Sequence, residues 1–124
     1  MLNFQQGKNC RFSLIFVGQN ELLATIRRLG QLEERLSVKC LLRPLSAEET
    51  TEYVTCRLVA AGAQRPIFEP SAMQPLYELS GGVPRRINRL CDLALLVGFA
   101  DESGSITAEQ VEAVAEELTA VVPD

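Results

Sequence analysis

Two adjacent arginines at the start of a predicted helix are the residues best placed for binding a ligand. Gly81 and Gly82, followed closely by Pro84, indicate a helix N-terminus, because proline's missing N–H is one of the donors left unpaired there. Arg85 and Arg86 then place two cations where the helix dipole is already positive and where acidic residues are preferred. Backbone N–H groups, a positive helix end and a guanidinium together describe a phosphate site. The alternative is structural, with both arginines solvated or paired with nearby carboxylates such as Glu78 or Asp92.

Gln19 is a second polar side chain in a position that suits a ligand. It follows residues 12–17 (FSLIFV), an almost continuously apolar and β-branched run that Gly18 ends. Such a run is typical of a strand buried on both faces of a parallel sheet, and open α/β sheets bind their ligands beyond the carboxyl ends of these strands. The alternative is that Gln19 is a loop amide and that Asn20 caps the helix that follows.

Composition removes several kinds of chemistry. The chain has 124 residues and a formal net charge of −4, which argues against a general nucleic-acid binder, although its middle is more basic than its ends. It contains no histidine, and its four cysteines lie far apart, so we expect no metal site and no nucleophile with a base beside it. The simplest interpretation of Cys40 and Cys91 is reduced, buried thiols in a cytosolic protein. We find no signal peptide and no apolar run that approaches the roughly twenty residues of a membrane span.

The first part of the chain predicts a strand, a helix and a second strand. An amphipathic helix over residues 21–29 follows the apolar run, and residues 37–42 form a short alternating strand. Strand, helix, strand is a parallel crossover unit. Two strands cannot make an independent parallel sheet, so either later helices cover them or further strands are missing.

After Pro44 the sequence predicts four helices. Ser46 and Glu49 form a capping box for a helix that Gly62 ends, and Thr107 with Gln110 forms another for the last helix. Between them we expect a helix over residues 70–79, kinked or starting late because of an internal proline, with Met73, Leu76, Tyr77 and Leu79 buried. The helix from Pro84 is apolar nearly all round over residues 93–100, which predicts that this half is buried.

These elements make the expected fold mainly α with a small α/β part. The change of character lies near Arg43 and Pro44. Residues 1–43 would be the remnant of an α/β core, and residues 44–124 a helical subdomain. No G-x-x-x-x-G-K-[ST] loop is present, so the chain has no recognisable cradle for a triphosphate of its own.

Three segments together resemble consecutive landmarks of a known family. Residues 14–22 (LIFVGQNEL), 36–46 (LSVKCLLRPLS) and 79–95 (LSGGVPRRINRLCDLAL) look like those of AAA+ ATPases of the general secretion pathway protein A type, in order and spacing. The resemblance covers nearly the whole chain, and the third segment is the most specific. It implies a truncated P-loop core followed by a four-helix lid. The Walker A loop and Walker B strand are expected before Met1, so this chain alone is expected not to hydrolyse ATP.

The resemblance also implies roles for individual residues. Gln19 matches sensor 1, which orients the attacking water or the γ-phosphate, and Arg35 matches the arginine offered to a neighbouring subunit's nucleotide. Arg85 matches the sensor 2 arginine, with Arg86 as the alternative, and the implied cofactor of the full-length protein is ATP with magnesium. Arg35 has the plain alternative of a solvated helix-end residue. The family often has proline where Asn20 stands and a small or apolar residue where Arg86 stands, so which arginine faces the nucleotide stays open.

On this resemblance the full-length protein is expected to be a cytoplasmic, oligomeric AAA+ ATPase that serves secretion or envelope machinery. Membrane association would come through regions outside this chain. Two alternatives stay open. One is a non-enzymatic helical interaction module whose arginines grip an acidic partner, and the other is a DNA-binding AAA+ regulator of the transposition type.

Overall fold

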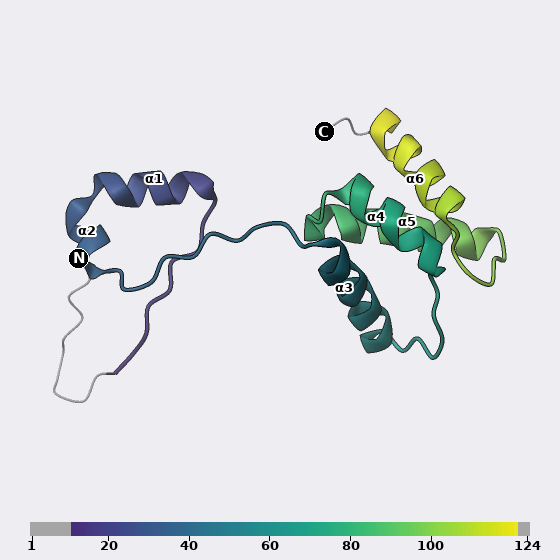
Figure 1. The fold of residues 1–124 in the computed structure, drawn as a ribbon, viewed down its shortest axis with the longest axis horizontal. Helices are drawn as coiled ribbons and strands as arrows, with labels where there is room; N and C mark the ends of the chain where they lie inside the picture. The colour runs from purple at the N-terminus through teal and green to yellow at the C-terminus, as the bar shows by residue number, and fades with distance from the viewer. Residues whose placement is uncertain (1–10, 122–124) are drawn as a thin grey trace. The chain divides into compact units, whose positions relative to one another are not determined.

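The computed structural model describes residues 11–121, and within them the chain is mainly helical. Six helices, α1 to α6, form the secondary structure of this range, together with one isolated β-bridge (Figure 1). The chain divides into two compact units, Met1–Leu42 and Arg43–Asp124. The expectation of a mainly α protein is confirmed, and the assignment of the two parts to a nucleotide-binding core and a lid stays a prediction.

The first unit contains α1 (Asn20–Arg28) and the short α2 (Gly30–Arg35), which pack against each other. α1 matches the helix predicted over residues 21–29, and its apolar face buries Ile26. Beyond α2, the Lys39 ammonium donates a hydrogen bond to the Glu33 carboxylate at 2.8 Å. This bond, with the positive charge of Lys39, lowers the pKa of Glu33 below its ordinary value.

The two strands predicted in the first unit are not formed in the structure. Neither residues 12–17 nor residues 37–42 carry a β-ladder, and the parallel crossover unit is therefore not shown. Their apolar side chains are exposed: Ile15 is 81%, Val17 88% and Leu42 91% accessible. A strand buried on both faces needs neighbouring strands for its backbone hydrogen bonds and covering layers for its side chains. The described residues provide neither, so the apolar pattern alone does not produce a sheet.

The second unit is a four-helix bundle of α3 (Ala47–Ala60), α4 (Pro70–Ser80), α5 (Pro84–Ala100) and α6 (Ala108–Val121). The four predicted helices are thus confirmed. α4 packs against α3, α5 and α6, and α6 packs against α5 as well (Figure 1). α4 therefore lies at the centre of the contacts that hold the bundle together.

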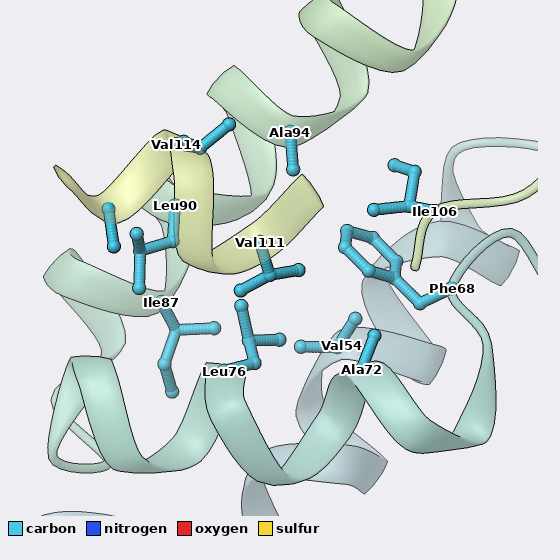
Figure 2. Packing of buried hydrophobic residues seen from close by; sticks show 11 residues of the cluster. Val54, Phe68, Ala72, Leu76, Ile87, Leu90, Ala94, Ile106, Val111 and Val114 are labelled. Carbon is cyan, nitrogen blue, oxygen red and sulfur yellow. The ribbon is translucent and has the colours of Figure 1, made fainter. Parts of the chain in front are cut away.

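The core of the bundle is apolar and draws on all four helices. Leu76, Ile87 and Val111 meet from α4, α5 and α6, and each is fully buried (Figure 2). Burying one such side chain contributes about 1.5–3 kcal/mol to stability. The other buried residues of this cluster are Val54, Phe68, Ala72, Leu90, Ala94, Ile106, Val114 and Ala115.

Both predicted capping boxes are present. The Ser46 hydroxyl accepts a hydrogen bond from the Glu49 N–H at 3.1 Å, and the Glu49 carboxylate accepts one from the Ser46 N–H at 2.9 Å. At the start of α6, the Thr107 hydroxyl accepts from the Gln110 N–H at 3.3 Å, and the Gln110 side-chain oxygen accepts from the Thr107 N–H at 3.0 Å. Each pair satisfies two donors that a helix start leaves unpaired, which explains why α3 and α6 begin where the sequence predicts.

Of the two outcomes expected for α4 from its internal proline, a kink or a late start, the late start does not occur. The helix begins at Pro70 and runs continuously through Pro75 to Ser80, without a late start. Pro75 removes one backbone hydrogen bond, but Ala72 and Leu76 on either side of it are fully buried. Their packing holds the first turns in place. Of the four residues expected to be buried in this helix, Leu76 is buried, whereas Leu79 is 44% exposed.

The expectation that the second half of α5 is buried was also wrong. Ala94 and Gly98 are buried on one face, whereas Leu96 is 64% and Phe99 84% exposed. An apolar composition on all sides favours burial only where neighbours cover every side. Among the described elements, α4 and α6 pack against α5, and Leu96 and Phe99 stay open to solvent.

A short parallel contact that the sequence analysis missed ties two loops together. Phe68 and Ile106 form an isolated β-bridge, in which the Glu69 N–H donates to the Ile106 carbonyl at 2.9 Å. The Ile106 N–H in turn donates to the Ile67 carbonyl at 2.8 Å. The bridge joins the segment before α4 to the segment before α6 and buries Phe68 and Ile106 to 3% exposure each.

Candidate anion site at the start of α5

The turn between α4 and α5 is built from two glycines with positive φ. Gly81 ends α4 in the left-handed conformation at φ 64°, and its N–H donates to the Tyr77 carbonyl at 2.8 Å. Gly82 follows at φ 76°, and its N–H donates to the Ser80 hydroxyl at 3.2 Å. The Gly82 carbonyl then accepts from the Leu45 N–H at 2.8 Å. These bonds fix the start of α5 against the segment that leads into α3.

α5 begins as predicted at Pro84, and its first turn has no side-chain cap. Val83 occupies the N-cap position, where its carbonyl accepts from the Ile87 N–H at 2.9 Å. No acidic residue lies in the first turn, and Arg85 and Arg86 both expose their side chains there. The helix start therefore places two cations in a first turn that contains no carboxylate.

Arg85 is exposed and is not paired with a carboxylate of the described residues, which agrees with the solvated form of the structural alternative and leaves its role toward a phosphate a prediction. Among the described residues it makes no hydrogen bond and no ion pair. Glu78, one of its two candidate partners, instead accepts a hydrogen bond from the Gln74 amide at 2.9 Å. Arg86 points elsewhere and lines a groove with Leu79 of α4 and Thr119 of α6. Arg85 is not among the residues that line this groove.

A third arginine, which the sequence analysis did not single out, lies beside the polar face of α5. The Tyr53 hydroxyl of α3 donates to the Asn88 side-chain oxygen at 2.8 Å, and Asn88 lies one turn after Arg85. The Arg57 guanidinium donates to the same hydroxyl at 3.4 Å and lies 5.8 Å from the centre of the Tyr53 ring. The sequence could have predicted this contact, because a tyrosine and an arginine four residues apart on one helix lie on the same face.

Cys91 adds no reactive group to this site. Burial, and to a lesser degree the Asp92 carboxylate, raises the pKa of the Cys91 thiol to about 12, while Arg57 opposes the shift. Cys91 is therefore protonated at neutral pH and behaves as a small apolar residue. The prediction that Cys40 is buried was wrong, since it is exposed, as is Cys56.

Gln19 and Arg35 belong to the first unit. Gln19 occupies the N-cap position of α1, with an exposed side chain that makes no capping hydrogen bond, while its carbonyl accepts from the Leu22 N–H at 2.9 Å. Asn20 is the first helical residue and not the cap. Arg35 is the last residue of α2 and is exposed. The roles of Gln19 and Arg35 toward a nucleotide stay predictions.

The fold and the site define a small helical bundle with an uncapped, doubly cationic helix start. By sequence the chain is similar to the general secretion pathway protein A of Aeromonas hydrophila, with 37% identity over 123 residues. This similarity covers 98% of the chain but 22% of the relative, so the chain spans about a fifth of that protein. The resemblance to general secretion pathway protein A inferred from the three segments is thus confirmed. No protein-family model matches the chain, and no solved structure does.

Among the described residues, no helix is both long enough and apolar enough to cross a membrane.

Proposed function

We propose that this chain is the last part of an AAA+ ATPase domain, in which Arg85 contacts the terminal phosphate of ATP. The observation that carries the proposal is an exposed guanidinium in the first turn of an uncapped helix, without a partner among the described residues. A cation there costs stability unless an anion visits, because the helix dipole is already positive. A phosphate group would meet both the guanidinium and the backbone N–H groups of the helix start.

The rest of the nucleotide site is assigned as follows. Gln19 orients the attacking water or the γ-phosphate, and Arg35 reaches the nucleotide of a neighbouring subunit. Magnesium and ATP require a phosphate-binding loop and an acidic strand, neither of which these 124 residues contain. The chain by itself therefore should bind nucleotide weakly and hydrolyse none, and turnover requires the remainder of a longer protein.

The similarity to general secretion pathway protein A supports a role in secretion. We infer that the whole protein uses ATP binding and hydrolysis to assemble or remodel secretion or envelope machinery, as an oligomer. Stabilisation of charge on a transferring phosphoryl group by a guanidinium is the step to which Arg85 contributes.

The test compares arginine variants in the full-length protein encoded by the gene. Arg85→Ala is expected to reduce kcat for ATP hydrolysis by about tenfold or more. The reason is that losing one transition-state contact of this type raises the activation free energy by up to several kcal/mol. Arg85→Lys should recover part of that loss because it restores a positive charge without the planar fork. Arg28→Ala, which removes an exposed arginine from the last turn of α1, is the matched control and should leave kcat nearly unchanged.

Two results would contradict the proposal. One is measurable ATP turnover by the purified 124-residue chain. The other is an Arg85→Ala protein whose activity equals that of the Arg28→Ala control. Binding to duplex DNA that weakens steeply with salt would instead favour the nucleic-acid alternative, and Arg85 would then act on a different phosphate.

A further inference from the structure

An open groove runs along the seam between α4 and α6. Its volume is about 590 Å³, within the range of sites that hold small ligands or short peptide segments. It lies between the facing sides of the two helices. The lining residues are Pro75, Glu78, Leu79, Glu112, Ala115, Glu116 and Thr119.

The floor of this groove is apolar and accessible. Leu79 is 44% exposed there, although it belongs to the apolar face of an otherwise packed helix. Pro75 and the largely buried Ala115, which is 8% exposed, line the same groove on α4 and α6. An apolar side chain inserted between them would remove this surface from water, with a gain proportional to the area buried.

Three carboxylates border the apolar floor. Glu112 and Glu116 are one turn apart on α6, and within the described part of the chain neither forms an ion pair or hydrogen bond. Glu78 lies on the α4 side and accepts one hydrogen bond, from the neutral Gln74 amide. Cationic groups on a bound segment would therefore find carboxylates that form no ion pair with a described residue.

A second, smaller pocket of about 240 Å³ continues the groove toward α5. It shares Leu79, Ala115 and Thr119 with the first, but two arginines, Arg86 and Arg89, line its other side. The positive charge of Arg89 disfavours a cation in that section. The charge pattern therefore confines a cationic ligand to the α4–α6 section.

We propose that the α4–α6 groove docks a short basic segment of a partner protein, in which lysine or arginine side chains flank a branched apolar side chain. The apolar side chain lies on Leu79 and Ala115, and the flanking cations face Glu78, Glu112 and Glu116. Charge complementarity selects this occupant over an acidic segment, which the carboxylates would repel. This surface is separate from Arg85 and does not depend on nucleotide chemistry.

The test measures binding of short fluorescent peptides to the 124-residue chain by anisotropy. The probe carries a Lys-Leu-Leu-Lys centre, and its partner probe carries Glu-Leu-Leu-Glu in the same frame. The lysine probe is expected to bind, and the triple variant Glu78→Gln, Glu112→Gln, Glu116→Gln is expected to weaken it about tenfold, from three exposed charge pairs of modest strength each. Leu79→Ser should weaken it separately by removing the apolar contact.

A matched triple variant separates a site from general attraction to an acidic protein. Glu34, Glu52 and Glu117 are exposed and lie outside the groove, so changing all three to glutamine removes the same charge. That variant should bind the lysine probe within about twofold of the unchanged chain. NMR amide shifts on adding the probe should concentrate in residues 75–79 and 112–119.

The proposal is overturned if both triple variants weaken binding equally, or if the glutamate probe binds as well as the lysine probe. Amide shifts centred on Arg85 or on α3 would also overturn it, as would no binding of the lysine probe at all. Unfolding midpoints of the variants, measured beside the unchanged chain, show that a loss of binding does not come from a loss of fold.

Discussion

The backbone of Gly82 lies directly against that of Leu45. The Gly82 carbonyl accepts a hydrogen bond from the Leu45 N–H at 2.8 Å, and a Cβ placed on Gly82 would lie 2.0 Å from the Leu45 carbonyl oxygen. No side chain fits at that distance. The pair joins the α4–α5 turn to the segment before α3. It thereby fixes the position of the first turn of α5, which carries the two arginines.

Gly82→Ala is therefore expected to destabilise the second unit strongly. The alanine must adopt a φ of 76° and also push the Leu45 backbone away, so the free energy of unfolding should fall by at least about 2 kcal/mol. Gly81→Ala is the matched control, because Gly81 has a similar φ of 64° but open space around its Cβ position. It should cost only the left-handed penalty, about 1–2 kcal/mol. Denaturant unfolding followed by circular dichroism measures both, and equal losses would contradict the steric argument.

Tyr53→Phe tests the polar link between α3 and α5. Loss of the partly buried hydrogen bond from the Tyr53 hydroxyl to Asn88 should reduce stability by about 0.5–1.5 kcal/mol. Because Arg57 donates to the same hydroxyl, a double-mutant cycle with Arg57→Ala should show coupling between the two positions. Additive losses in that cycle would mean that Arg57 and Tyr53 do not act together.

The capping box of α3 should make the free energy of unfolding decrease as the pH falls into the acid range. The hydrogen bond from the Ser46 backbone N–H, followed by that with the Ser46 side chain, lowers the pKa of Glu49 from its ordinary value of 4.5. A lowered folded-state pKa adds stability at pH values above the unfolded-state pKa, and this stability is lost as pH falls through the folded-state pKa. Glu49→Gln keeps the hydrogen-bonding shape without the charge, so its stability deficit should be present at neutral pH and shrink in acid.

The measurement is denaturant unfolding of the Glu49→Gln chain across the acid range, beside the unchanged chain. Glu52→Gln, which removes another exposed carboxylate from α3, is the matched control. A deficit for Glu49→Gln that stays constant down to strongly acid pH would contradict the assignment.

Thr50 carries a buried hydroxyl whose hydrogen-bonding capacity is not used. The side chain is fully buried in α3, and its Oγ has no hydrogen-bond partner within residues 11–121. Thr50→Val replaces this hydroxyl with a methyl group of similar shape, so stability should rise by about 1 kcal/mol. Thr51→Val is the matched control, because the Thr51 hydroxyl donates to the Ala47 carbonyl at 3.2 Å and its loss should give no gain. Thermal unfolding of both variants measures the change. A midpoint for Thr50→Val that does not rise above that of the unchanged chain would contradict the prediction.

Local signals in the sequence were enough for three of the four helix starts in the second unit, those of α3, α5 and α6. The pairs Ser46–Glu49 and Thr107–Gln110 satisfy helix-end donors within four residues of chain, so no distant contact is needed to place α3 and α6. Pro84 marks the start of α5 for the same local reason, because it needs no hydrogen-bond acceptor there. The candidate Arg85 followed from this placement.

Only the tertiary structure decided which apolar residues become core, because burial depends on what lies opposite each side chain. Residues 12–17 carry the pattern of a buried strand yet remain exposed, since a sheet is a property of several segments together. Leu76 and Leu96 are the same residue type on neighbouring helices, but only Leu76 faces the other helices of the bundle. The close approach of Gly82 to Leu45 and the α4–α6 groove likewise arise between segments far apart in the chain. A local sequence pattern does not predict the distances between such segments, because these distances are determined by how the helices pack.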